Sequence, residues 1–293
     1  MKGLWHYLEQ RHALVWPQLQ RDLAPFGLEL ERHHELIVDA DAQSVGILTR
    51  GEGLDFSRRV RAQLERLEPD PLVLAHFDAQ CDWMAHTRMF VKLEWQAQHS
   101  WPRVSWYHRR RPSVASVLSF FASRLAPAAL ESISRLAQLL EKDSIHFVAG
   151  HQRPGQPLRY KVYFSQAVSS LRAHAVAHRL RQALEQGGYP SPELARWQLW
   201  HSHWQQQAHE ATLFVSLELD ELGPLPGLKL DYPHIRPADV VFWAPPERAQ
   251  RWWVCAQELV QALERRRLSH LGLRLNRDQV AVRFYVEGVV APS

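Results

Sequence analysis

The chain has 293 residues, and 46% of them are hydrophobic, so it can bury the core of one large domain or two small ones. Its two cysteines, Cys81 and Cys255, lie far apart and in no Cys-x-x-Cys pair, which excludes a disulfide framework and a thiolate zinc site. A reducing cytoplasm is therefore the expected compartment. The formal net charge of +4 suits a phosphorylated small molecule, nucleic acid or anionic lipid equally well.

Neither end of the chain predicts export or membrane insertion. The N-terminal residues are amphipathic and lack the apolar core of a signal peptide. No run of about 18 apolar residues occurs, which a transmembrane helix would need. We expect neither a secreted protein nor a membrane-spanning one.

Short segments of alternating polarity occur in pairs, and a helical segment follows each of the first four pairs. The predicted strands, in chain order, are 28–33, 43–49, 89–95, 103–109, 145–149, 158–164, 211–219, 227–232, 271–275 and 280–286. The predicted helices are 57–67, 113–142 with a break at Pro127, 166–186 and 247–267. Because no low-complexity linker interrupts this pattern, one domain over residues 1–293 is expected.

Ten strands joined in pairs by short loops predict an antiparallel sheet that closes on itself, because an open sheet would leave long exposed edges. The helices carry apolar stripes, such as Leu130, Ile133 and Leu136, that must pack against the outer face of the sheet. The expected fold is thus an α+β protein with a ten-stranded barrel inside a ring of helices. Ten strands enclose more space than side chains fill, so a cavity is expected in the lumen.

Polar side chains recur on one face of several predicted strands. In 158–164, Arg159, Lys161 and Tyr163 share a face because alternate side chains of a strand point the same way. The same pattern gives further polar rows: Lys92 with Glu94; Ser105 with Tyr107 and Arg109; Lys229 with Asp231; and Arg283 with Tyr285. Rows of cations and phenols facing a lumen would suit an oligophosphate.

This arrangement resembles the ABBA-type aromatic prenyltransferases, whose PT barrel is built from repeated α-β-β-α units. The family's Arg-x-Lys-x-Tyr strand matches Arg159, Lys161 and Tyr163. In size the chain is nearest the small bacterial members, such as the cyanobactin peptide prenyltransferases. The resemblance implies transfer of a dimethylallyl or longer prenyl group from its diphosphate to an aromatic or other nucleophilic side chain, in a ribosomal peptide of natural product biosynthesis.

The resemblance also assigns roles to residues. The expected ligands of the prenyl diphosphate are Lys92, Arg159, Lys161, Lys229 and Arg283. Three tyrosines are expected to shield the allylic cation: Tyr107, Tyr163 and Tyr285. The chain has no Asp-Asp pair, so direct clamping by cations is favoured over an obligatory metal cluster, with Mg²⁺ possible as a counter-ion of the diphosphate.

The general base is expected near the first strand. In the peptide enzymes an early Leu-Glu supplies the acid near the acceptor, and Leu28-Glu29 occupies a similar place with Glu31 on the same face. Glu29 and Glu31 are therefore the candidate bases, with His146 and Glu94 as alternatives.

Two positions depart from the family pattern. Asp231 stands where a Lys-x-Tyr pattern is frequent, and the adjacent Tyr232 is on the opposite face of the strand. The second strand of the first unit has no inward basic residue, unless Arg50 supplies one.

Three other interpretations remain open. The acceptor could be a free indole or phenol, or the barrel could carry an apolar ligand without catalysis. The basic run 108–112 near Trp101 and Trp106 could belong to a nucleic-acid module, although a solvated turn is favoured and nucleic acid is not expected as a partner. Convergence of the polar rows in one lumen would distinguish an enzyme from these alternatives.

Overall fold

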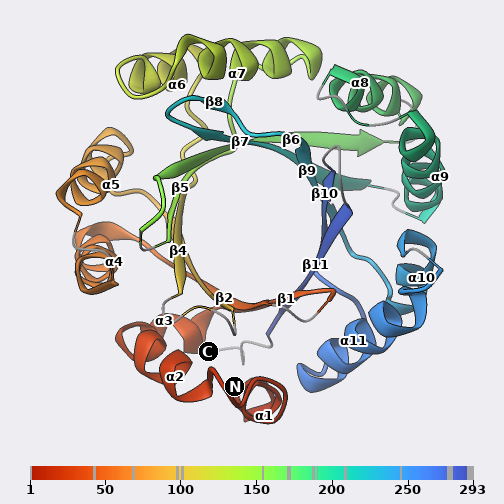
Figure 1. Ribbon diagram of the computed structural model, residues 1–293, viewed down its shortest axis with the longest axis horizontal. Helices are drawn as coiled ribbons and strands as arrows, with labels where there is room; N and C mark the ends of the chain where they lie inside the picture. The colour runs from red at the N-terminus through yellow and green to blue at the C-terminus, as the bar shows by residue number, and fades with distance from the viewer. Residues whose placement is uncertain are drawn as a thin grey trace.

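The computed structural model shows a closed barrel of antiparallel strands inside a ring of helices (Figure 1). It describes residues 2–41, 44–67, 70–96, 99, 102–153, 155–169, 173–186, 189, 191–207, 210–244, 246–275 and 280–288. The expected fold class is therefore confirmed.

Ten strands form the barrel, and a two-residue strand, β8 (Gly223–Pro224), pairs with one edge of β7. The barrel strands are β1 (His34–Asp39), β2 (Ser44–Gly51), β3 (Met89–Gln96), β4 (Arg103–His108), β5 (Phe147–Gln152), β6 (Arg159–Ser169), β7 (Glu210–Asp220), β9 (Leu228–Pro233), β10 (His270–Leu275) and β11 (Val280–Glu287).

The strands follow one another around the barrel in the order β6, β5, β4, β3, β2, β1, β11, β10, β9, β7, and the pairing of β7 with β6 closes the ring. Every pairing is antiparallel, so each strand has hydrogen-bonded neighbours on both sides and no long edge is exposed.

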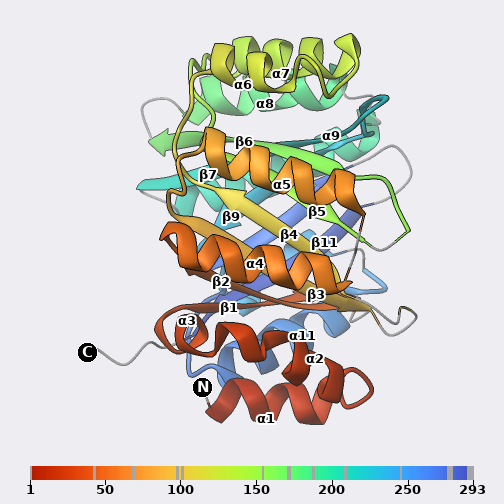
Figure 2. The same ribbon diagram turned by 90° about the vertical axis from the view of Figure 1, so that its left-hand side faces the viewer.

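Helices cover the outside of the barrel. They are α1 (Lys2–Arg11), α2 (Trp16–Leu23), α3 (Gly27–Arg32), α4 (Gly53–Leu67), α5 (Pro71–Trp83), α6 (Val114–Phe121), α7 (Pro127–Leu139), α8 (Ala173–Gln186), α9 (Ser191–Gln207), α10 (Val240–Trp243) and α11 (Ala249–Ala262), with 3-10 turns at Ala24–Phe26 and Pro237–Asp239. Figure 2 shows α4 and α5 lying across the outer face of the strands. Within the described part of the chain, no helix has the length and apolarity needed to cross a membrane.

The main core lies between the strands and the helices. On β3, Val91, Leu93 and Trp95 point outward and are almost completely buried, whereas Lys92 and Glu94 alternate with them and point inward. The alternation of a strand thus separates an apolar outer face from a polar lumen.

The last four predicted strand pairs occur, and the break at Pro127 is confirmed because this proline begins α7. The first predicted strand, 28–33, is wrong: residues 27–32 form α3, and β1 begins at His34. The helical spacing of Leu23, Phe26 and Leu30, which are all buried, prevails over the Leu-Glu alternation. Gln43, the predicted start of the next strand, lies outside the described residues.

The predicted helix 166–186 begins too early. Residues 166–169 continue β6 and pair with 210–213 of β7, and α8 begins only at Ala173. The sequence-based scheme also lacks α5 and α9. Asp70 caps α5 by accepting a hydrogen bond from the backbone N–H of Leu72, with Pro71 at the first helical position.

Candidate active site

The lumen of the barrel holds a cavity of about 280 Å³. Its walls combine aromatic rings with basic and acidic side chains. The residues on which the following description depends are Glu35, Lys92, Tyr107, Tyr163, Lys229 and Tyr285. These side chains come from β1, β3, β4, β6, β9 and β11, so nearly the whole circumference of the barrel contributes.

A first buried ion cluster forms around Glu94 on β3. Its carboxylate accepts hydrogen bonds from Lys92 Nζ at 2.7 Å, from Arg103 at 2.8 Å and from both terminal nitrogens of Arg283 at 2.9 Å. Burial alone would raise the pKa of Glu94, but the three cations hold it well below its usual range. Glu94 is thus a structural counter-ion for these cations. Its lowered pKa makes it a poor proton acceptor, so it is withdrawn as an alternative general base.

A second cluster forms around Glu218 on β7. His151 lies 2.8 Å from its Oε1, and Lys161 and Arg274 lie 3.2 and 2.6 Å from its Oε2. Arg159 completes the group at 3.5 Å. Burial opposes the charge on Glu218, but Lys161 and its other positive neighbours keep the pKa of this carboxyl well below its usual range. The sequence analysis did not select Glu218, because it recognised no row of polar side chains on the predicted strand 211–219.

Lys229 on β9 belongs to a third group. Its ammonium donates to Asp231 on the same strand and to the Tyr285 hydroxyl, the latter at 2.8 Å. Burial opposes its charge, but Asp231 and Tyr285 raise the pKa of Lys229 above its usual value. The ion pairs of Lys92, Arg159, Lys161, Lys229 and Arg283 lie on the lumen side of the barrel wall, as their positions on the strands predicted. Among these five residues, Lys92 and Lys229 line the cavity itself.

Aromatic rings occupy the section of the lumen next to these cations. Tyr107 and Tyr163 contact each other edge to face with centroids 5.9 Å apart, and Phe147 meets Tyr163 at the same distance. Burial raises the pKa of Tyr107 to about 12 and that of Tyr163 well above its usual value, so both phenols stay neutral. Neutral rings can face a carbocation without reacting as phenolates.

Glu35 on β1 is one of the acids that line the cavity, together with Asp231 and Glu287, and the sequence reasoning did not select it. Glu35 lines the cavity, accepts a hydrogen bond from the Ser269 hydroxyl and lies 3.5 Å from His270 Nδ1. Burial opposes protonation of His270, but Glu35 raises the pKa of this imidazole above its usual value. The sequence signal was the alternation His33, Glu35, Ile37, which appears once the strand is shifted to its observed position.

The two residues expected to act as bases lie elsewhere. Glu29 and Glu31 belong to α3, outside the barrel, because the strand predicted there is a helix. Glu29 pairs with Arg59 of α4, with Nη1 2.8 Å from Oε2, and Glu31 is exposed. This corrects the placement of both residues: neither lines the lumen cavity.

The structure also places four other residues that the sequence analysis discussed. Burial, and then Arg109 and Arg111, lower the pKa of His146 to about 4, so this alternative base is a weak proton acceptor. Tyr232 points outward to Trp197, as its position on the strand predicted. Arg50 and Arg109 line the mouth of the cavity.

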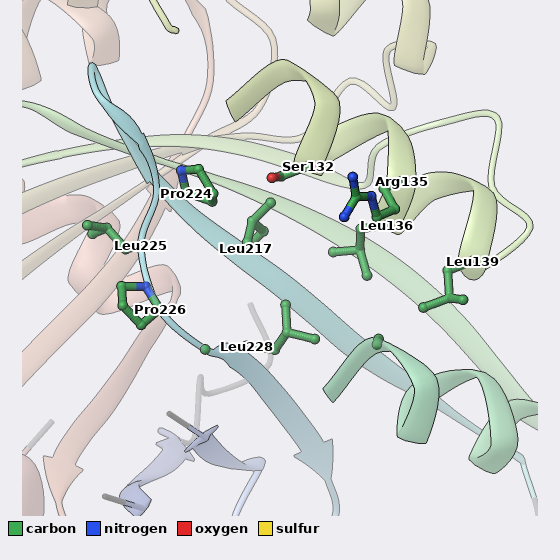
Figure 3. Close-up of a pocket in the computed structure, with 11 residues that line it drawn as sticks. Ser132, Arg135, Leu136, Leu139, Leu217, Pro224, Leu225, Pro226 and Leu228 are labelled. Atoms are coloured by element: carbon green, nitrogen blue, oxygen red, sulfur yellow. The ribbon is translucent and has the colours of Figure 1, made fainter. Parts of the chain in front are cut away.

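A second cavity, of about 420 Å³, lies outside the barrel beside α7 and the segment 224–228 (Figure 3). Leucines and prolines make up most of its wall. Its Ser132 hydroxyl donates to the Ala128 carbonyl, and Arg135 pairs with Glu131 on the same helix. Since these polar groups are already satisfied locally, we place the candidate site in the lumen.

The known structures most relevant to this geometry are prenyltransferases. The 5-dimethylallyltryptophan synthase from Streptomyces coelicolor superimposes with a TM-score of 0.59 at 15% identity, over 87% of this chain and 80% of that one. AnaPT from Neosartorya fischeri gives 0.61 at 14% identity, over 89% and 80%. The barrel has the fold of the aromatic prenyltransferases. PriB, solved with L-tryptophan and dimethylallyl thiolodiphosphate, gives 0.54 at 15% identity, over 87% and 79%.

These likenesses concern the fold, because the identities are low. No family model and no curated protein sequence matches the chain. The narrower resemblance to cyanobactin peptide prenyltransferases receives no support from the similar structures.

Proposed function

We propose that this protein transfers a dimethylallyl group from its diphosphate to an electron-rich aromatic acceptor inside the barrel. The observation that carries the proposal is the set of cations on the inner face of the barrel, Lys92, Arg159, Lys161, Lys229 and Arg283, of which Lys92 and Lys229 line a cavity walled by aromatic rings. Convergence of this kind argues against a nucleic-acid surface, which would present its cations outward.

The proposed reaction begins with loss of the diphosphate. The bond between the allylic carbon and the bridging oxygen breaks, and the diphosphate leaves with the electron pair. Preorganised cations stabilise this developing charge, and they act strongly because the lumen is buried. The allylic cation left behind faces Tyr107, Tyr163 and Tyr285, whose π-faces stabilise positive charge and exclude water.

The acceptor ring then forms the new carbon bond and must lose a proton. Glu35 is the proposed general base, because it lines the same cavity as the tyrosines and the hydroxyl of Ser269 fixes its carboxylate. This assignment replaces Glu29 and Glu31.

For the acceptor we propose a free small aromatic, such as an indole or phenol. The cavity of about 280 Å³ is at the small end of ligand sites. This size favours a five-carbon donor and a single-ring or two-ring acceptor over a peptide chain. The L-tryptophan in the PriB structure is consistent with an indole acceptor.

We further propose that the buried cations suffice for leaving-group stabilisation, and that Mg²⁺ acts only as a counter-ion of the diphosphate. Cytoplasmic location and a single domain over 1–293 belong to the same proposal.

Incubation with dimethylallyl diphosphate and a panel of free aromatics and peptides, with and without chelator, tests the function. We expect a prenyl-sized mass gain on an indole or phenol that survives chelation and is lost in Lys161→Ala. A prenyl-sized mass gain on peptides alone would show that the acceptor is a peptide and not a free aromatic. A folded protein that modifies no acceptor with any prenyl donor would contradict it.

The pKa of Lys161 predicts a pH dependence of donor binding. Burial lowers this pKa to about 8, although Glu218 acts in the opposite direction. Lys161 is therefore protonated below about pH 8 and loses its charge above it, so donor affinity should fall roughly tenfold from pH 7 to 9. Calorimetric titration with dimethylallyl diphosphate across this range measures the slope.

Lys161→Arg is the matched comparison, since a guanidinium stays charged throughout this range. Its affinity should change little between pH 7 and 9. Equal slopes in both proteins would show that another group causes the pH dependence.

A further inference from the structure

Ser216 on β7 has a buried hydroxyl without a partner. Its side chain is 2% exposed, and its Oγ has no hydrogen-bond partner among the described residues. Phe214 and Glu218, two positions to either side on the same strand, both face the lumen, so Ser216 faces it as well. A hydroxyl buried in this way is destabilising unless it has a hydrogen-bond partner.

The neighbours of Ser216 across the sheet are residues of the candidate site. It pairs with Tyr163 on β6 and with Lys229 on β9, the strands that flank β7. Lys161, one inward position from Tyr163, stands on the other side of β7 from Lys229. Since adjacent strands are about 4.8 Å apart, the strands β6 and β9 that carry the two lysines are separated by about 10 Å, with β7 between them.

The ammonium groups of Lys161 and Lys229 belong to the two strands that flank β7. Each is bound to a carboxylate, Lys161 to Glu218 and Lys229 to Asp231, and Lys161 also experiences the positive charge of Lys229. A dianion or trianion that contacts both lysines must lie over β7, the strand between them. On β7, Glu218 is opposite Lys161 and Ser216 is opposite Lys229. Of these two side chains, Ser216 has the free O–H that can donate to an anionic oxygen.

We propose that the Ser216 hydroxyl is a further ligand of the donor's diphosphate and donates a hydrogen bond to one of its oxygens between Lys161 and Lys229. The assignment rests on the proposed function for the identity of the anion. It differs from a structural role, because a structural serine would already have a partner in the folded chain.

Titration calorimetry with inorganic diphosphate tests this contact in the wild type and in Ser216→Ala. Hydrogen bonds to charged groups contribute about 1.5–3 kcal/mol, so we expect Kd to rise at least about tenfold in the variant. The melting temperature without ligand should stay the same or rise, because the substitution removes an unpaired polar atom. A structural serine would instead lower the melting temperature.

Ser165→Ala is the matched control. Ser165 is on the inward face of β6, two positions beyond Tyr163 and opposite Phe214, at the aromatic level of the lumen. Its loss should leave the Kd for diphosphate unchanged. An unchanged Kd in Ser216→Ala, or an equal change in both variants, would overturn the assignment of Ser216 alone.

The outcomes separate this assignment from the proposed function. A wild-type protein that does not bind diphosphate would overturn both. Tight diphosphate binding that is lost in Ser216→Ala would support the ligand role of Ser216 even if no acceptor were prenylated, and in that case only the proposed function would fail.

Discussion

Replacing Glu35 by glutamine is expected to lower kcat for prenyl transfer by about 10²–10⁴-fold, the usual contribution of a general base. The amide keeps the size of the side chain and its contact with Ser269 but cannot accept the proton of the acceptor ring. Donor binding should change little, because Glu35 is absent from the ion clusters around Glu94 and Glu218. Steady-state kinetics combined with diphosphate calorimetry would separate the two effects.

Glu31→Gln is the control, since Glu31 has the same chemistry but is exposed on α3, outside the barrel. Its kcat should equal that of the wild type. If Glu31→Gln lost activity and Glu35→Gln kept it, the sequence-based choice of base would be restored.

Replacing Glu218 by glutamine is expected to lower the free energy of unfolding by about 3 kcal/mol, because removal of one partner leaves buried charges uncompensated. Glu218 is 4% exposed and neutralises Lys161 and Arg274, with Arg159 at 3.5 Å. Denaturant unfolding would measure the loss. Added diphosphate should recover much of it, because the ligand supplies the missing negative charge and binds only the folded state.

Glu221→Gln tests whether any loss of acidic charge has this effect. Glu221 follows the same strand but is exposed, and no ion pair of its side chain is found in the described structure. It should unfold like the wild type. Equal destabilisation of the two variants, or no rescue of Glu218→Gln by diphosphate, would contradict the role given to the Glu218 cluster.

Much of the barrel could be predicted because strand alternation is local. The polar rows on β3, β4, β6, β9 and β11 were assigned to the lumen from their spacing alone, and the observed ion pairs of Lys92, Lys161, Lys229 and Arg283 lie on that side. The alternation also identified Tyr232 as outward-facing.

The failures have a common cause, because period-two polarity can also fit a helix. Residues 27–32 alternate, but Phe26 and Leu30 are four apart and both become buried, so the segment is helical and β1 starts later. A shift of this size moves the candidate acid from Glu29 to Glu35. The prediction for residues 166–169 was wrong in the opposite sense. They were predicted to be helical, and only their pairing with β7 shows that they belong to a strand.

The sequence by itself determined which side chains share a face, because the backbone geometry of a strand sets that pattern within a few residues. It did not determine which cation meets which carboxylate. Glu94 contacts Arg283, 189 positions away, and Glu218 contacts Arg274, 56 positions away. These partners are set by the order of strands around the closed ring and by their register. The position of Ser216 between two lysines was likewise decided only by the tertiary structure, because three strands must pair before that space exists.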